Sequence, residues 1–301
     1  MDIANLLEEK RLKRFFSVKH KLIVENGLYH VTQRAPGREI LFLEEADYLY
    51  FLHLLKETSK KFNVDVYAFA LMPNHLHLFV YLNEKNLDKA MKKIFQRYAI
   101  YFNTKYCRKG HVFCGAYRCA LCNDERYALV TSLYIHLNPF KAGLAKNMQG
   151  YRWTSLEIYL NPEIKSFVKN DKILKFLDSD KEKAAAIYKN ILKESSGIDY
   201  KSRWGTFKES KSIFELFFKK MEMLKIVVQK KNEKVFQPLN KKINALRMKK
   251  KLISSEDKKA LIYTIEQLKS RGFNLTEAAE ILGVSRTKIY RVANVTKSVL
   301  N

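Results

Sequence analysis

Two histidines separated by one residue lie in an apolar stretch that reads as a β-strand, and this pairing limits how the chain can fold. The stretch follows a bend at 73–74, and successive side chains of a strand leave opposite faces of its sheet. His75 and His77 therefore project together, while Leu76 and Leu78 point into a core. Imidazole is the commonest metal ligand, so the pair can supply half of a metal site. The alternative is one buried, hydrogen-bonded histidine and one histidine on the surface.

Hydrophobic periodicity around this strand predicts an antiparallel sheet with helices packed against it. The two strands joined at 73–74 are expected to pair as neighbours. The predicted elements are a strand over 27–34, a helix over 44–62, strands over 64–72 and 75–82, a helix over 86–106, an extended segment over 110–118, and a helix from 125 to about 137 that ends at 138–139. This order resembles a ferredoxin-like split βαβ arrangement, which is an α+β fold.

The last of these helices carries a second candidate for chemistry. Tyr134 and Asn138 are four residues apart, so they share one helix face if the helix continues through its final turn. A hydroxyl nucleophile and a neutral amide ligand would then stand side by side. The alternative for Tyr134 is core packing with a hydrogen-bonded hydroxyl. His136 lies on a different face and is expected to be structural.

The charge of the chain indicates a polyanionic partner. Its 301 residues include 56 Lys and Arg against 31 Asp and Glu, a formal net charge of +25, which exceeds what solubility requires. A lysine-rich composition without a target is the alternative. The 47% hydrophobic content indicates a globular protein. No signal peptide or membrane span is recognised, so a cytoplasmic, nucleoid-associated protein is expected.

Four cysteines lie within one short interval of the sequence. Cys107, Cys114, Cys119 and Cys122 are separated by six, four and two residues, a spacing that fits no common zinc finger. Ordinary reduced thiols are the default expectation in a cytoplasmic protein, and structural zinc is the alternative.

Several motifs in order resemble the single-tyrosine HUH transposases, and in particular the branch of REP-associated tyrosine transposases. The resemblance covers roughly residues 22–159. The motifs are Tyr29-His30-Val31-Thr32, Met72-Pro73-Asn74-His75-Leu76-His77, Tyr101-Phe102-Asn103-x-Lys105-Tyr106-x-Arg108-x-Gly110-His111-x-Phe113, Tyr134-Ile135-His136-Leu137-Asn138-Pro139-x-x-Ala142-Gly143-Leu144 and Tyr151-x-Trp153-Thr154-Ser155. Several ordered motifs together are more specific than a single His-x-His.

The family resemblance implies a nuclease that cuts and rejoins single-stranded hairpin DNA through a 5′-phosphotyrosine intermediate. It implies that His75 and His77 bind the metal, that Tyr134 is the nucleophile, and that Asn138 is a third ligand, a position where some relatives have glutamine. Mg²⁺ or Mn²⁺ is the expected ion, although imidazole ligation alone does not exclude zinc. The chemistry suits these residue types, because a phenol attacks phosphorus poorly unless a divalent ion polarises the phosphate. Either a monomer or a homodimer is compatible with the sequence.

Basic side chains near these motifs are candidate phosphate contacts, with a solvated surface charge as the alternative. One group is Lys105, Arg108, Lys109 and Arg118, and the other is Arg34 and Arg38. The tyrosines at 98, 101, 106 and 127 are expected in the core or as stacking platforms for single-stranded bases.

The remainder of the chain predicts two further regions. The expected domains are a catalytic domain over 1–160, a basic helical connector over 161–254 and a helix-turn-helix module over 255–301. Residues 201–250 carry 15 Lys and Arg against 4 Asp and Glu. A helix is expected over 258–268, and 275–292 has the spacing of a helix-turn-helix with a turn at Gly283, a cap at Ser285, and Ile281, Val284 and Ile289 in its core. The residues expected to face a DNA major groove are Ser285, Arg286, Thr287, Lys288 and Arg291.

Taken together, these patterns predict a metal-dependent transposase that cleaves and rejoins single-stranded DNA, with an accessory module for duplex DNA. One alternative is a non-catalytic regulator that binds a specific DNA sequence through the helix-turn-helix. An RNA-binding protein is a third, because charge does not distinguish RNA from DNA.

Overall fold

The computed structural model describes residues 23, 25–37, 39–122, 125–198, 207–224, 243–246, 248, 254–270 and 274–291. The chain divides into two compact units, Phe16–Gln229 and a second unit formed by Met1–Phe15 with Lys230–Asn301. Each unit is described by itself. Arg38, one of the expected phosphate contacts, lies outside the described residues.

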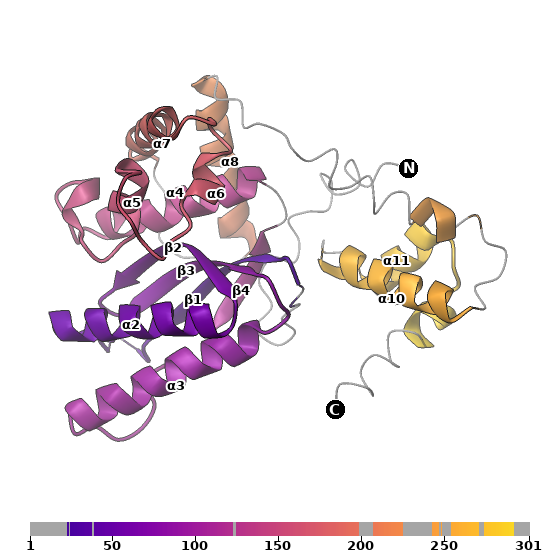
Figure 1. The fold of residues 1–301 in the computed structure, drawn as a ribbon, viewed down its shortest axis with the longest axis horizontal. Coiled ribbons are helices and arrows are strands. Elements are labelled where there is room, and N and C mark those ends of the chain that lie inside the picture. Colours follow the sequence, from indigo (N-terminus) through magenta and orange to yellow (C-terminus); the bar gives the residue numbers. More distant parts are fainter. Residues whose placement is uncertain are drawn as a thin grey trace. The chain divides into compact units, whose positions relative to one another are not determined.

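The first unit is built on a four-stranded sheet in the order β2-β3-β1-β4. The strands are β1 (Leu28–Arg34), β2 (Val64–Met72), β3 (His75–Leu82) and β4 (Arg118–Cys122), and each neighbouring pair is antiparallel. Helices α2 (Glu45–Lys61) and α3 (Leu87–Lys105) cover one face, and α4 (Glu125–Lys141) lies on the other (Figure 1). The predicted α+β fold with helices packed on an antiparallel sheet is therefore confirmed.

Alternation along β3 separates a core face from the face under α4. Leu76 and Leu78 are fully buried, and because they alternate with the two histidines they point toward the layer of α2 and α3 (Figure 1). His77 points to the opposite face, where its ring contacts side chains of α4. The orientation predicted from the His-x-His pattern is confirmed.

The fourth strand differs from its predicted position. An extended segment was expected over 110–118, but β4 begins only at Arg118. Gly110 and Gly115 have φ angles of 99° and 68°, in the left-handed region that interrupts an extended chain. The pairing partners of β1 are instead Arg118 to Cys122, which oppose Thr32 to Leu28. The prediction was wrong because most of the segment, although it contains residue types that are common in strands, forms a loop.

Helix α4 continues beyond its predicted end. The helix was expected to stop at Asn138-Pro139, but it extends to Lys141 with Pro139 inside it. All residues from Tyr127 to Pro139 are buried. The free energy gained by burying every side of the helix offsets the loss of the backbone hydrogen bond that a proline removes. Tyr134 and Asn138 therefore lie one turn apart in a continuous helix.

The chain after the sheet packs back onto the same unit. Residues 151–169 run along β2, with Leu71 N–H donating to the Trp153 carbonyl at 2.9 Å and Lys169 N–H to the Val66 carbonyl at 2.7 Å. The helices of this part of the chain are α5 (Leu156–Leu160), α6 (Asp171–Leu174), α7 (Lys181–Ser195) and α8 (Phe207–Met223). The helices α5, α6 and α7 lie with α4 on the same side of the sheet (Figure 1).

Helix α4 is tied to these later elements by a buried hydrogen-bond network. The two ring nitrogens of His136 lie 2.8 Å from the hydroxyls of Tyr188 on α7 and Ser155, and Phe69 N–H of β2 donates to the Ser155 Oγ at 2.9 Å. The structural role predicted for His136 agrees with these contacts, since β2, α4 and α7 are held together through one imidazole.

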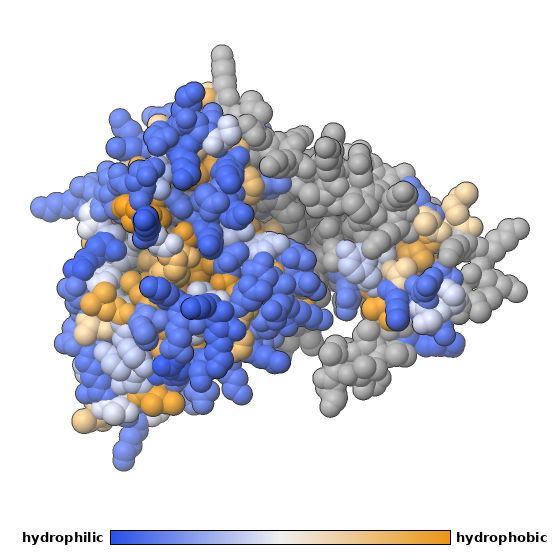
Figure 2. Space-filling view, viewed as in Figure 1, coloured by the Kyte–Doolittle hydropathy of each residue, from blue (hydrophilic) through white to orange (hydrophobic). Residues whose placement is uncertain are grey.

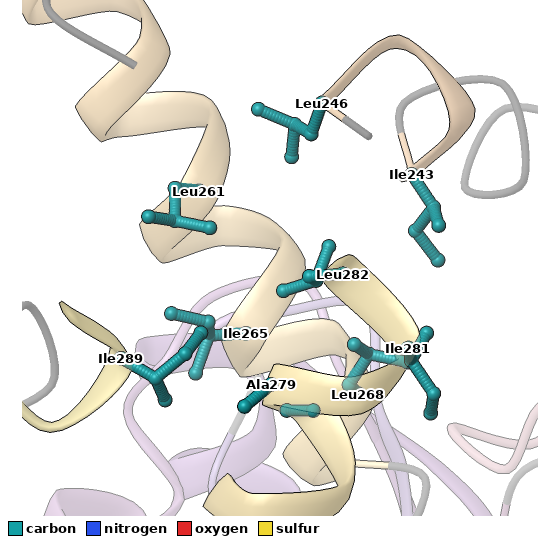
Figure 3. Packing of buried hydrophobic residues seen from close by; sticks show 10 residues of the cluster. Ile243, Leu246, Leu261, Ile265, Leu268, Ala279, Ile281, Leu282 and Ile289 are labelled. Carbon is teal, nitrogen blue, oxygen red and sulfur yellow. The ribbon is translucent and has the colours of Figure 1, made fainter. Parts of the chain in front are cut away.

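The second unit has a small core of its own (Figure 3). It contains α10 (Ser255–Ser270), α11 (Leu275–Leu282) and a further helical segment over 286–291. Gly283 ends α11 with φ 64°, and Lys288 N–H donates to the Ser285 Oγ at 3.3 Å, as a capping serine does. The buried residues of this core include Leu261, Ile265, Leu268, Ala279, Ile281, Leu282 and Ile289. Of the core residues expected here, Ile281 and Ile289 are buried in this cluster, and Val284 is partly buried against it.

One face of the described residues is mainly polar (Figure 2). On the face seen in Figure 2, hydrophilic side chains cover most of the described helices and hydrophobic side chains are scattered among them. Among the described residues, no helix has both the length and the apolar composition of a membrane span.

Candidate active site

Asn138 of α4 meets His77 of β3, the second histidine of the His-x-His pair. The amide nitrogen of Asn138 lies 2.8 Å from Nε2 of His77. An amide N–H can only donate, so Nε2 of His77 accepts and the proton of this neutral ring is on Nδ1. That Nδ1 lies 2.9 Å from Nε2 of His30 on β1. The proton on His77 is thus donated to His30, and three side chains from three elements form one hydrogen-bonded chain.

His75 is oriented by its neighbour in the same motif. Its Nδ1 lies 2.7 Å from the side-chain oxygen of Asn74, which can only accept. The proton of His75 is therefore on Nδ1, and the lone pair is on Nε2. The rings of His75 and His77 are 5.2 Å apart between centroids. Both histidines of β3 thus carry an Nε2 lone pair.

Tyr134 is the second α4 residue at this site. Its ring centroid lies 5.7 Å from that of His77 and 6.1 Å from that of His30, in edge-on arrangements. The side chain is fully buried. Because Tyr134 and Asn138 share one helix face, both residues reach the same histidine of the same chain.

The histidines of this site are held neutral. Burial lowers the pKa of His30 to about 3. Burial, with a smaller contribution from the Arg34 charge, lowers the pKa of His75 to about 4. Burial also lowers the pKa of His77 well below its usual value, with further effects of His30 and His75. Desolvation penalises the imidazolium form, so these rings keep the lone pairs that a metal ligand needs.

The side chains fit a divalent cation in their donor types. The Asn138 side-chain oxygen is buried and has no hydrogen-bond partner among the described residues, so its lone pairs are available. Within the part of the chain that the structure describes, no group of three or more His, Cys, Asp or Glu side chains gathers around a possible ion. The set here combines two imidazoles with one amide. Of the four cysteines, Cys107 and Cys114 are exposed, and Cys119 and Cys122 are buried.

The expected phosphate contacts fall into two classes. Arg34 opposes His75, and Thr32 opposes both His77 and Arg118, in antiparallel register, so both arginines share the face of the histidines. By contrast, the Nζ of Lys105 lies 2.5 Å from Glu44 and 2.7 Å from Asp47, and Arg108 lies 2.5 Å from Glu39. Lys109 is exposed.

Two features of the site were not predicted from the sequence. His30 was recognised only as part of a motif, although residues 30, 32 and 34 of one strand share a face and could have indicated its direction. The buried Asp47 was also missed. Its carboxylate accepts hydrogen bonds from Lys105, Tyr101 and Tyr106 of the motif on α3 and from the backbone N–H groups of Leu43 and Glu44.

In the second unit, the residues expected at a DNA groove lie mostly at the surface. Ser285, Arg286, Thr287 and Arg291 are exposed, and Lys288 is half-buried. The guanidinium of Arg286 lies 3.6 Å from Glu280 in an exposed pair, which competes only weakly with a phosphate.

Comparison with known proteins agrees with the motifs of the sequence. Residues 23–138 match the family described as IS200-like transposases. A solved structure of a REP-associated tyrosine transposase bound to a REP hairpin is similar, with a TM-score of 0.43 and 15% identity, over 50% of this chain and 89% of that chain. No curated protein sequence matches. The resemblance expected from the motifs is therefore confirmed: residues 23–138 resemble the IS200-like transposases.

Proposed function

We propose that this protein cleaves and rejoins single-stranded DNA through a covalent 5′-phosphotyrosine intermediate at Tyr134. The observation that carries the proposal is that Tyr134 and Asn138, one turn apart on α4, both contact His77. A nucleophile, an amide ligand and a pair of neutral imidazoles therefore meet within one chain. The family match of residues 23–138 supports a transposase reaction at this place.

In the proposed cleavage step, the Tyr134 oxygen forms a bond to the scissile phosphorus, and the bond from phosphorus to the 3′ oxygen breaks. The phenol loses its proton and the departing 3′ oxygen gains one, so a free 3′ hydroxyl is produced. Because one phosphoester replaces another, the 3′ hydroxyl of a second strand can reverse the step and rejoin DNA without ATP. The same residues therefore account for both cutting and joining.

His75, His77 and Asn138 would hold the divalent cation, proposed as Mg²⁺ or Mn²⁺. When bound, such an ion supplies Lewis-acid polarisation of the phosphate and offsets charge that develops on its oxygens. The three ligands are neutral, so they do not repel the phosphate or cancel the positive charge that attracts it. Arg34 and Arg118, on the same face of the sheet, are proposed to hold the DNA strand beside this site.

The proposed reaction site is assembled in cis. Tyr134 lies against His77 of its own chain, and the contacts of His136 with Ser155 and Tyr188 hold the same helix on its own sheet. A monomer therefore contains every proposed catalytic group. This arrangement does not require exchange of α4 between two subunits.

Hairpin-containing single strands are the proposed substrate, on the basis of the family motifs. The exposed residues 285–287 and Arg291 of the second unit support an accessory role in binding duplex DNA. A regulator without catalytic activity would use only that second unit.

A covalent-capture assay tests the proposal. The protein is incubated with hairpin-containing single strands from the DNA that flanks its own gene, labelled at the 3′ end, with Mg²⁺ or Mn²⁺, and analysed on a denaturing gel. We expect a protein–DNA adduct that is lost in Tyr134→Phe and in the His75→Ala, His77→Ala double variant, and kept in the control Tyr127→Phe on the same helix. An adduct that persists in Tyr134→Phe removes the nucleophile, and the absence of any adduct favours the regulator.

A further inference from the structure

We propose that His30 is a positioning residue, which holds His77 in the one tautomer and orientation that leave its Nε2 lone pair for the metal. This inference rests on the proposed function and deepens it, because it assigns a role to a residue outside the His-x-His pair. His30 is fully buried on β1, next to the strand that carries His77.

The two rings meet edge to edge and are nearly parallel, as an in-plane hydrogen bond between ring nitrogens requires. Nε2 of His30 lies 2.9 Å from Nδ1 of His77, and the two rings are 5.1 Å apart between centroids with an interplanar angle of 20°. His30 therefore meets the edge of His77 that bears Nδ1. The Nε2 edge of His77 meets Asn138. With both edges engaged, the imidazole of His77 has little freedom to rotate.

The protons along this chain can be assigned from the donors and acceptors. Asn138 N–H donates to Nε2 of His77, so the proton of His77 is on Nδ1 and is donated to Nε2 of His30. If the Asn138 amide were turned and the chain reversed, the proton would be on Nε2 of His77, and that atom could not bind a metal. In the competent arrangement His30 is the acceptor for Nδ1–H of His77, and in the reversed one it would be a donor.

The choice of histidine as the orienting residue has an electrostatic consequence. Metal-binding histidines usually donate their second N–H to a carboxylate, a carbonyl or a water. Here the acceptors are both neutral side chains, His30 for His77 and Asn74 for His75. A carboxylate in either place would add negative charge beside an incoming phosphate. A neutral acceptor fixes the tautomer without that repulsion.

His30 is not itself a ligand in this arrangement. Its Nε2 is already used as the acceptor for His77, on the side of that ring away from Asn138. A substitution that keeps an acceptor at this place should therefore preserve the site, whereas loss of a true ligand should not be rescued in this way.

Two variants test whether His30 acts as a hydrogen-bond acceptor or only fills space beside His77. His30→Gln places an amide oxygen near the former Nε2 position, and His30→Leu fills a similar volume without an acceptor. His136→Leu is the matched control, because His136 is an equally buried histidine whose ring bonds Tyr188 and Ser155 instead. Urea unfolding of each full-length variant reports how far the substitution destabilises the fold.

The first measurement is the tautomer of His77 in metal-free protein. Nitrogen-15 NMR of histidine-labelled protein distinguishes Nδ1–H from Nε2–H, and the His77 signals are assigned by their loss in His77→Gln. We expect Nδ1–H in the unsubstituted protein, in His30→Gln and in His136→Leu, and a mixture of tautomers in His30→Leu. Nε2–H in the unsubstituted protein, or an unchanged pattern in His30→Leu, overturns the proposal.

The second measurement is Mn²⁺ affinity, followed by electron paramagnetic resonance without DNA. Loss of an orienting partner typically weakens metal binding by about 10- to 100-fold, so we expect a loss of this size in His30→Leu and its rescue in His30→Gln. Equal weakening in both variants overturns the positioning role. If the unsubstituted protein binds no Mn²⁺, the metal role in the proposed function fails, and the tautomer measurement still decides the role of His30.

Discussion

Asn138 on α4 donates to Nε2 of His77 on β3 at 2.8 Å, although the two residues are 61 positions apart in the sequence. This contact joins the helix that carries Tyr134 to the strand that carries the His-x-His pair. Since the Asn138 oxygen remains buried without a hydrogen-bond partner among the described residues, the same amide can turn its oxygen toward a cation. Under the proposed function, this amide is the group that would change its orientation when a cation binds.

Replacement of Asn138 should weaken metal binding more than it weakens the fold. In Asn138→Leu, the amide oxygen is lost, and we expect Mn²⁺ affinity to fall by about 10- to 100-fold. Asn138→Gln keeps an amide and should retain part of this affinity. Calorimetric titration with Mn²⁺ measures both variants, and unchanged affinity in Asn138→Leu would exclude the amide as a ligand.

The two classes of basic side chain should differ in their contribution to DNA binding. Arg34 lies on the face of the histidines, whereas Arg108 pairs with Glu39. We expect Arg34→Ala to weaken binding of single-stranded DNA and to lower the salt dependence of binding by about one phosphate contact. Arg108→Ala should change both quantities less. Fluorescence anisotropy over a range of salt concentrations measures them, and equal effects would contradict this distinction.

The buried carboxylate of Asp47 should matter for stability. It accepts five hydrogen bonds that join the start of α2 to the end of α3. Removing one partner of a buried charged pair costs about 3–5 kcal/mol, so Asp47→Asn should lower the free energy of unfolding by an amount of this order. Glu57→Gln is the control, because its pair with Arg97 is partly exposed and should contribute much less to the free energy of unfolding. Urea unfolding compares the two.

The buried His136 should make the fold sensitive to acid. Burial lowers its pKa to about 3, whereas an unfolded chain has a histidine pKa of about 6.5. Between these values the unfolded state binds the proton and the folded state does not, so stability is fully present above about pH 6.5 and is lost as the pH falls toward 3. In metal-free protein, His136→Gln should reduce the proton uptake on unfolding near pH 5 by about one. Urea unfolding at several pH values measures this slope, and an unchanged slope would contradict the neutral assignment.

The second unit should bind duplex DNA independently of strand cleavage. Lys288→Ala and Arg291→Ala remove cations from the segment that follows Ser285, and each should lower the salt dependence of duplex binding by about one phosphate contact. Formation of the covalent adduct at Tyr134 should be retained. Lys259→Ala, an exposed lysine on α10, is the control for loss of charge alone. A duplex affinity that responds equally to all three substitutions would indicate non-specific attraction.

Local periodicity was sufficient to predict which site residues share a face when they lie on the same strand or helix. The two-residue repeat of a strand places His75 and His77 on one face, and helical spacing places Tyr134 and Asn138 on another. The motif order predicted a resemblance to a transposase family, and residues 23–138 match the model of the IS200-like transposases. The shared faces follow from backbone geometry, whereas the family came from the resemblance of the motifs.

Contacts between elements could not be obtained in this way. The loop over 110–117 uses residues with strand propensity, and α4 continues through Pro139, because pairing with β1 and burial on all sides outweigh local preference. The ion pair between Lys105 and Asp47 also depends on the packing of α2 against α3.

The sequence by itself determined that two histidines share a face, that a tyrosine and an asparagine share another, and that the chain is strongly basic. Only the tertiary structure decided that these faces meet, that His30 lies behind His77, and that α4 lies over its own sheet. The physical reason is that strand register and helix docking are set by the burial of many side chains together, whereas a local pattern records only the direction in which each side chain leaves the backbone.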